Sequence, residues 1–353
     1  MFWNYRKWLL SYPPHQFFPS FLLVYQKKDV SLSPEIVDVT NLTIMSCKIF
    51  RILSLIAIIL TFLSCRNENV SVESRSAYYW STTWELDSAQ RDFLKDNKVS
   101  RIYLRYFDVV IDPRGEVMPN ATLRFADSIP QGVEIVPVVF IVNDCMAKGV
   151  DSLGHLILNR VLQMSETHDV MNVKEIQIDC DWSKRTHDAY FAMLRQLRDA
   201  LHAKGLRLSA TIRLHQLSQE VPPVDRGVLM MYNTGDVRRL ERNPILDMDD
   251  AAPYMRHIKG YGLPLSTAYP IFSWQVLVRA NRYAGIIHGD DDLAVLPGDT
   301  IITHEVSLDT VLMVREAIDR LRPDANREII LFDISKNNIQ RIKQTHYEKI
   351  YHP

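Results

Sequence analysis

The stretch "EIQIDCDWSK" (residues 175–184) decides how the rest of this chain is interpreted. It begins as an apolar strand and ends in two acids, Asp179 and Asp181. Because side chains alternate along a strand, Gln177 shares one face with both acids, and the residues between them share the other face. A buried strand with two carboxylates at its carboxyl end is typical of a parallel sheet that presents a site there.

Seven further apolar segments resemble this strand, and helical patterns separate most of them. The predicted strands cover residues 77–84, 101–109, 133–142, 174–182, 206–214, 227–233, 263–272 and 328–334. Between them, residues 187–204 carry an apolar stripe, and Ser88 and Ser307 are predicted helix caps. Alternating strands and helices predict an α/β fold, a single-domain (β/α)8 TIM barrel. An open doubly wound sheet is the alternative, but the sequence contains no glycine-rich nucleotide motif that favours it.

Composition and motifs limit the partners. The 353-residue chain has a net charge of -1, so nothing favours binding to nucleic acid. We predict no cofactor and no metal, because no histidine or cysteine pattern has zinc spacing. The acidic stretch "HGDDDL" (288–293) is interpreted as a solvated turn, since it lacks the spacing of a calcium loop. We expect a monomer.

A second signal precedes the strands. From Met45, a basic start with Lys48 and Arg51 leads into an apolar run, 52–63, that is too short to span a bilayer comfortably. It resembles a bacterial lipoprotein signal peptide (45–64) with lipidation at Cys65. Residues 1–44 are then interpreted as an over-long gene prediction, 65–76 as a tether and 77–353 as the barrel. This predicts an anchor in the bacterial cell envelope, with the outer membrane favoured; a short membrane anchor is the alternative.

Two cysteines, Cys145 and Cys180, remain in the predicted barrel. Both follow neighbouring strands, so a disulfide is geometrically conceivable in an oxidising envelope. We favour two buried free thiols.

Polar and aromatic residues follow the strands at the carboxyl end of the barrel, the mouth. They are Arg105, Asp108, Asp179, Asp181, Arg213, His215, Tyr232, Asn233, Tyr269, Trp274 and Asp333. Two nearby carboxyl groups cannot both ionise freely, so one of Asp179 and Asp181 should have a raised pKa and suit proton transfer. The competing interpretation is that an aspartate caps a helix or pairs with Arg213 as scaffold. Seven aromatic residues also come near the mouth, of which we expect two or three to line a groove: Trp80, Trp84, Tyr106, Trp182, Tyr232, Tyr269 and Trp274.

Three segments in order resemble glycoside hydrolase family 18, the chitinases and endo-β-N-acetylglucosaminidases. "IDCDWS" resembles its fourth-strand signature D-x-x-D-x-D-x-E, "MMYN" (230–233) its strand-six M-x-Y-D, and "LPLSTAYPIFSW" (263–274) its strand-seven region. In that family the acetamido oxygen of the substrate is the nucleophile, an exception among glycosidases. The resemblance implies catalytic roles for Asp181, which would orient the acetamide, for Asp179 as its support, and for Tyr232 as a hydrogen-bond donor. It implies substrate contacts from the other mouth residues and a ligand that contains N-acetylhexosamine.

The departures from the family pattern matter as much. Ser183 stands where the acid Glu is expected, Asn233 replaces an aspartate, and strand eight offers "LFDIS" without a tryptophan. A serine hydroxyl cannot protonate a leaving group at neutral pH. Either another acid has taken over, with Asp108, Glu305 and Asp333 as candidates, or the barrel binds a glycan without hydrolysing it. A different class of function, a structural, assembly or adhesion lipoprotein, is the alternative.

Overall fold

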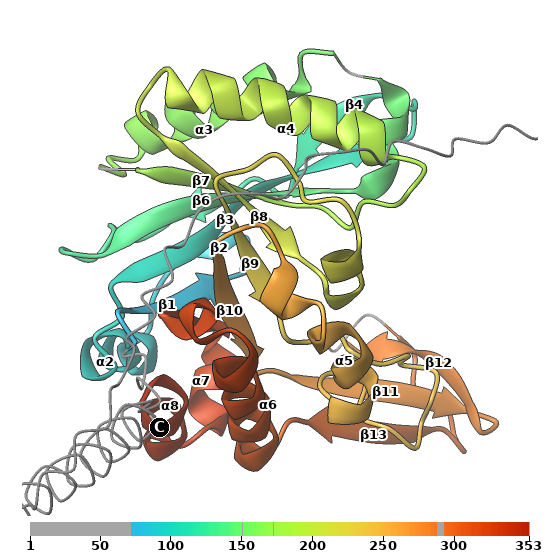
Figure 1. Ribbon diagram of the computed structural model, residues 1–353. Helices are drawn as coiled ribbons and strands as arrows, with labels where there is room; N and C mark the ends of the chain where they lie inside the picture. Colours follow the sequence, from blue (N-terminus) through green and yellow to red (C-terminus); the bar gives the residue numbers. More distant parts are fainter. Residues whose placement is uncertain (1–71, 150, 172, 288–292, 353) are drawn as a thin grey trace, which may run out of the picture. The chain divides into compact units, whose positions relative to one another are not determined.

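The computed structural model describes residues 72–149, 151–171, 173–287 and 293–352, and Figure 1 shows their arrangement. Eight parallel strands form a closed barrel, as predicted. They are β1 (Ser74–Tyr79), β3 (Arg101–Ile111), β6 (Glu134–Ile141), β7 (Glu175–Asp179), β8 (Arg207–Ile212), β9 (Arg226–Met230), β10 (Leu265–Pro270) and β14 (Glu328–Phe332). Pairing of β1 with both β14 and β3 closes the ring, and β4 (Val117–Asn120) adds to β3 as an antiparallel strand.

Helices cover the outside of the barrel. They are α2 (Ser88–Asp96), α3 (Leu153–Thr167), α4 (His187–His202), α5 (Met248–Met255), α6 (Leu308–Leu321), α7 (Lys336–Arg341) and α8 (Gln344–Tyr351). Ser307 caps α6 as predicted, since its side chain accepts a hydrogen bond from the Thr310 amide. The cap of α2 was predicted one residue too late: Asp87 accepts from the Gln90 amide, and Ser88 is the first helical residue. None of the helices in the described part of the chain has the length and apolar composition of a membrane span.

An insertion between β10 and α6 was not predicted. It is an antiparallel sheet of β11 (Ser273–Arg279), β12 (Arg282–Ile287) and β13 (Thr300–Glu305), which stands beside the barrel (Figure 1). A smaller parallel pair joins β2 (Thr83–Trp84) to β5 (Arg124–Phe125). The insertion begins directly after β10, so it continues the chain at the carboxyl end of the barrel.

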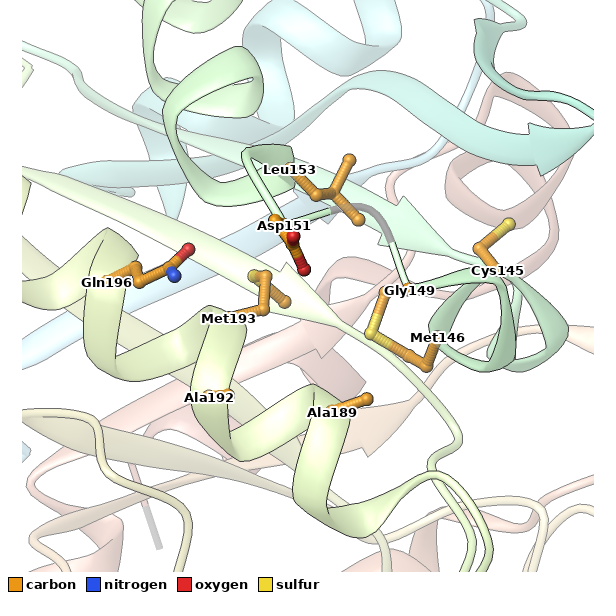
Figure 2. Close-up of a pocket in the computed structure, with 9 residues that line it drawn as sticks. All are labelled: Cys145, Met146, Gly149, Asp151, Leu153, Ala189, Ala192, Met193 and Gln196. Carbon is orange, nitrogen blue, oxygen red and sulfur yellow. The ribbon is translucent and has the colours of Figure 1, made fainter.

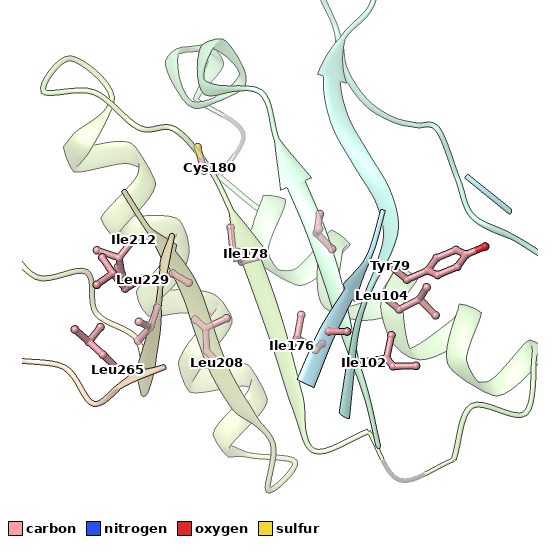
Figure 3. Close-up of a cluster of buried hydrophobic side chains, with 14 of the residues drawn as sticks. Tyr79, Ile102, Leu104, Ile176, Ile178, Cys180, Leu208, Ile212, Leu229 and Leu265 are labelled. Atoms are coloured by element: carbon pink, nitrogen blue, oxygen red, sulfur yellow. The ribbon is translucent and has the colours of Figure 1, made fainter. Parts of the chain in front are cut away.

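Alternation along the strands separates two apolar layers. Outward residues such as Ile176, Ile178 and Cys180 pack with the helices (Figure 3). The inward residues form a separate set, the inner cluster, made of Tyr78, Tyr103, Val136, Val138, Val228, Met230, Tyr232, Ile245, Ala268 and Ile330. Gln177 joins this interior, because its side-chain oxygen accepts a hydrogen bond from Tyr78 on β1, at 2.6 Å. The face of β7 predicted to look inward therefore does.

Ionic side chains fill the opposite, amino-terminal end of the barrel. Glu328 on β14 accepts hydrogen bonds from Ser76 Oγ at 2.6 Å and from Arg101 Nη1 at 3.0 Å, and it pairs with Arg226. These partners come from β1, β3 and β9, so one carboxylate connects four strands. Buried ion pairs of this kind need nearly complete hydrogen bonding to offset their desolvation.

The predictions for the segments before the barrel have different outcomes. The first strand begins at Ser74, inside the segment predicted as a tether, because Ser74 to Ala77 pair with β14. The predicted signal peptide, Cys65 and the segment 1–44 lie outside the described residues. Cys145 and Cys180 are buried free thiols, as favoured.

Candidate functional site at the carboxyl end of the barrel

The two aspartates of β7 lie beside Arg213, which follows β8. Asp179 is 3% exposed and accepts a hydrogen bond from Thr211 Oγ1 at 2.6 Å. Arg213 donates through Nε to Asp181, and its Nη2 lies 3.5 Å from Asp179. The structure thus brings Asp179 and Asp181 together, with Arg213 between them. This is the contact expected if an aspartate pairs with Arg213 as part of the scaffold.

Electrostatics at this pair follow from burial and from the arginine. Burial raises the pKa of Asp179, although Arg213 and Thr211 oppose that shift. Burial lowers the pKa of Arg213, but Asp179 and Asp181 outweigh it and raise that pKa overall. Arg213 therefore stays charged, whereas burial still leaves the pKa of Asp179 above its usual value.

A second arginine–carboxylate pair, Arg105 with Asp108, forms on β3. The Nε atom of Arg105 donates to Asp108 at 2.8 Å, and Nη2 binds the other carboxylate oxygen. Residues three apart face opposite sides of a regular strand, yet these two meet, because the register against β6 shifts between Arg105 and Phe107. This β-bulge turns Asp108 to the same side as Arg105, which the sequence did not reveal.

Aromatic rings continue the inner cluster toward the mouth. Trp80, Phe272, Trp274 and Phe332 are partly buried and pack against that cluster. The Phe332 ring lies 4.8 Å from Tyr232 and 5.5 Å from Trp80, and the Arg105 guanidinium stands 5.3 Å from the centre of the Trp80 ring. Of the seven aromatics named from the sequence, three belong here: Trp80, Tyr232 and Trp274.

Tyr232 is the polar residue within these rings. Its side chain is 4% exposed, and its hydroxyl is buried without a hydrogen-bond partner among the described residues. Burial raises the pKa of this hydroxyl, so it is a neutral donor at physiological pH. Buried hydroxyls are usually paired, which makes this one a candidate contact for a ligand.

Other predicted mouth residues lie elsewhere, and the prediction for Tyr269 was wrong. Tyr269 faces outward: it is fully buried in the helix layer, where its hydroxyl donates to Asn326 at 2.9 Å. Ala268 occupies the inward position instead, so alternation places Tyr269 behind the sheet. Trp274 belongs to the mouth, but β11 of the insertion positions it rather than a barrel strand. Trp84, Tyr106 and Trp182 are also buried among the outward residues.

His215 and Asn233 are both exposed. His215 is part of the 3₁₀ helix Leu214–Ser218 after β8. Asn233 adopts a left-handed backbone with φ of 56°, a conformation that asparagine tolerates better than most residues. The chain therefore changes direction at Asn233, one residue after Tyr232.

Two of the three residues considered as a displaced acid are paired with an arginine, and the third is Asp333. Asp108 is paired with Arg105, and Glu305 lies 3.3 Å from Arg341. Asp333 is half-buried after β14, where burial raises its pKa to about 6 against hydrogen bonds from Ser335 and Asn338. The Ser183 hydroxyl lies near Asn143 and Thr186, so it belongs to the turn before α4.

Phe272 and Phe332 were missed as mouth residues. The signal was available: Phe272 lies four residues after the inward Ala268, and Phe332 lies two after the inward Ile330. Counting by two from an apolar inward position would have found both.

The cavity in Figure 2 is not part of this site. It measures about 110 Å³ and lies outside the barrel, against the 3₁₀ helix Asn143–Lys148, the start of α3 and one face of α4. Cys145, Met146 and Met193 are among the residues that line it, and none of the mouth residues does. Across residues 72–149, 151–171, 173–287 and 293–352, no three His, Cys, Asp or Glu side chains gather closely enough to hold a metal ion.

Comparison with known proteins shows similarity of fold. No protein-family model matches the sequence, and no curated protein matches it. The spore cortex-lytic enzyme SleL of Bacillus cereus is similar in structure, with a TM-score of 0.51 at 12% identity over 80% of this chain and 75% of that one. SleL of Bacillus megaterium QM B1551 gives 0.51 at 10% identity, over 76% and 72%. A chitinase from Chromobacterium violaceum ATCC 12472 gives 0.51 at 12% identity, over 79% and 98%.

Proposed function

We propose that this barrel binds a glycan containing N-acetylhexosamine at its mouth and does not hydrolyse it. The observation that carries the proposal is the buried hydroxyl of Tyr232, which has no hydrogen-bond partner among the described residues and is enclosed by the rings of Phe272 and Phe332. Aromatic rings suit the C–H faces of sugars, and a lone donor within them supplies an oriented hydrogen bond. The similarity to a chitinase and to two cortex-lytic enzymes supports the choice of ligand class.

The pairing of the acids supports binding without hydrolysis. Arg213 holds Asp181, and Arg105 holds Asp108, so these carboxylates are fixed in place and can position polar groups of a ligand. Because the Tyr232 hydroxyl has almost no contact with solvent, a ring of the mouth must swing aside when the ligand enters. Changes of side-chain rotamer like this are common on binding.

Hydrolysis by a displaced acid is the second candidate function. It is favoured by Asp333, whose pKa of about 6 suits an acid near neutral pH and whose charge is close enough to influence Tyr232. In this alternative, release of product from a labelled glycan is lost in both Asp333→Asn and Asp181→Asn. The binding-only proposal expects no product from the wild-type chain.

The test of binding uses Tyr232→Phe, which removes only the hydroxyl. Since that hydroxyl has no described protein partner, its removal should leave the fold intact and weaken binding by about 0.5–1.5 kcal/mol. Calorimetry of the full chain with chito-oligosaccharides and with host-type N-glycans measures this loss, and tryptophan fluorescence reports the movement of the rings. Tyr254→Phe, on the exposed face of α5, is the matched control and should bind as the wild type does.

No heat with any of these glycans, together with unchanged behaviour of Asp181→Ala, would overturn the proposal. It would favour the alternative of a structural, assembly or adhesion protein.

We further propose that the chain is a lipoprotein anchored through Cys65 to a bacterial membrane, the outer membrane being favoured. Support comes from the sequence alone, in the short apolar run before that cysteine. Intact-mass measurement of the cellular protein tests this, because the lipid adds mass at Cys65. Any peptide from before Met45 would contradict the start site.

A further inference from the structure

We infer that His304, on the inserted sheet, is a second polar contact for the glycan, so that the site takes an oligosaccharide rather than a single sugar. This inference rests on the proposed function and names a longer ligand for the same site. His304 belongs to β13, which the sequence did not predict.

The position of His304 follows from the register of the sheet. His304 pairs directly with Trp274 across β13 and β11. Residues opposite each other in an antiparallel pair point to the same face, with Cβ atoms about 5 Å apart. Trp274 packs against the inner cluster, and Val306, directly after β13, contacts both the inner cluster and the outer apolar layer. His304 therefore lies on the face of the inserted sheet that is turned toward the mouth.

The Nε2 atom of His304 is buried and has no hydrogen-bond partner in the described part of the chain, and the side chain is 8% exposed. Buried imidazole nitrogens are normally bonded, because burying an unpaired polar atom costs free energy. A neutral imidazole offers one donor and one acceptor, which match the hydroxyl and acetamido groups of a sugar. Tyr232 and His304 thus share one property, a buried polar atom without a partner among the described residues: Tyr232 lies beside Phe272 and Phe332, and His304 lies opposite Trp274.

The rings between these two residues indicate the size of the ligand. The Tyr232 and Phe272 rings are 5.8 Å apart, and those of Phe272 and Trp274 are 5.7 Å apart. His304 lies one strand beyond Trp274. A ligand that reaches both polar atoms must pass along this row of rings, so it contains more than one sugar unit.

The experiment compares N-acetylglucosamine with chito-oligosaccharides, by calorimetry on the full chain. The variants are His304→Phe, which removes the polar atoms, His304→Gln, which keeps a donor and an acceptor, and Tyr232→Phe. His304→Phe should weaken binding of the oligosaccharides about two- to twelvefold, the equivalent of one hydrogen bond, and leave binding of the monosaccharide unchanged. Tyr232→Phe should weaken binding of both ligands. His304→Gln should restore part of the affinity for the oligosaccharides, and His155→Phe, on the exposed side of α3, is the matched control.

The outcomes separate the two proposals. If the wild-type chain binds oligosaccharides and both His304 variants bind them equally well, this inference is overturned and the proposed function stands. If the wild-type chain binds none of the glycans, both are overturned. Should His304→Phe fail to fold, as judged by circular dichroism, His304→Ala takes its place. Weaker binding of the oligosaccharides by His304→Ala supports the contact, and affinity equal to the wild type overturns it.

Discussion

At the residue scale, Arg213 determines what the two aspartates of β7 can do. Its guanidinium binds Asp181 and lies 3.5 Å from Asp179, so it holds both side chains in place. A pair of acids without this arginine would share a proton, as acid–base pairs in active sites do. One side chain from the next strand therefore favours positioning over proton transfer.

This pairing predicts the effect of Arg213→Met. The change leaves the charge of Asp179 buried and unpaired, which should cost about 3 kcal/mol of unfolding free energy at pH 7. Because burial raises the folded-state pKa of Asp179, the acid becomes neutral as the pH falls, and the loss relative to the wild type should shrink by pH 4.5. Urea unfolding of the wild type and of Arg213→Met at pH 7 and at pH 4.5 measures this loss of unfolding free energy.

The matched control is Arg195→Met, on the exposed side of α4, where we expect a change within about 0.5 kcal/mol. An equal loss at both pH values would show that Arg213 acts through packing rather than through charge.

At the scale of elements, small departures from regular structure position the site. The bulge in β3 brings Arg105 and Asp108 to one face, and a left-handed backbone at Asn233 turns the chain directly after Tyr232. The inserted sheet supplies Trp274 and His304. Each departure changes which side chains face the mouth without changing the barrel.

The start of α2 offers a prediction at this scale. Asp87 and Gln90 form a capping box, with hydrogen bonds of 2.8 and 3.0 Å, whereas Ser88 lies inside the helix. Asp87→Ala should therefore lower the unfolding free energy by about 1 kcal/mol, and Ser88→Ala should have little effect. Chemical denaturation measures both. Asp92→Ala, exposed on the same helix, controls for the loss of a charge. A larger destabilisation by Ser88→Ala than by Asp87→Ala would show that Ser88 is the cap, as the sequence suggested.

At the scale of the whole molecule, Glu328 connects strands that are distant in sequence. Its hydrogen bond to Ser76 joins residues 252 positions apart. Burial raises the pKa of Glu328, but Arg226 and Arg101 outweigh it and lower that pKa to about 2. The barrel is thus closed at its amino-terminal end by a carboxylate that stays charged under most conditions.

Acid stability should depend on this carboxylate. Its folded-state pKa of about 2 lies below the ordinary value of 4.5, so its contribution is present above about pH 4.5 and is lost as the pH falls toward 2. Over this interval, we expect the unfolding free energy of the wild type to fall by about 3 kcal/mol more than that of Glu328→Gln, because the glutamine side chain cannot be protonated there. Urea unfolding at pH 5 and pH 2.5 checks this, with the exposed Glu316→Gln on α6 as control. Parallel pH profiles for wild type and Glu328→Gln would contradict the role of Glu328.

Much of the barrel could be predicted, and parts of the site could not. The eight strands followed from apolar runs, and the inward face of β7 followed from alternation. Tyr269 was misplaced because the same alternation was not counted from Ala268, and the inserted sheet was missed because its apolar runs are short and no helical pattern separates its strands. The Arg105–Asp108 pair depends on a bulge, which only the register against β6 reveals.

The sequence by itself determined the local pattern of this protein: which segments are strands, which side chains alternate, and that Asp179, Asp181 and Gln177 share a face. Only the tertiary structure decided what those side chains meet. It placed Arg213 between the aspartates, gathered Trp80, Phe272 and Phe332 around Tyr232, and brought His304 beside Trp274. The physical reason is that periodicity is a property of neighbours along the chain, whereas charge pairing, burial and pKa depend on distances through space that barrel closure sets.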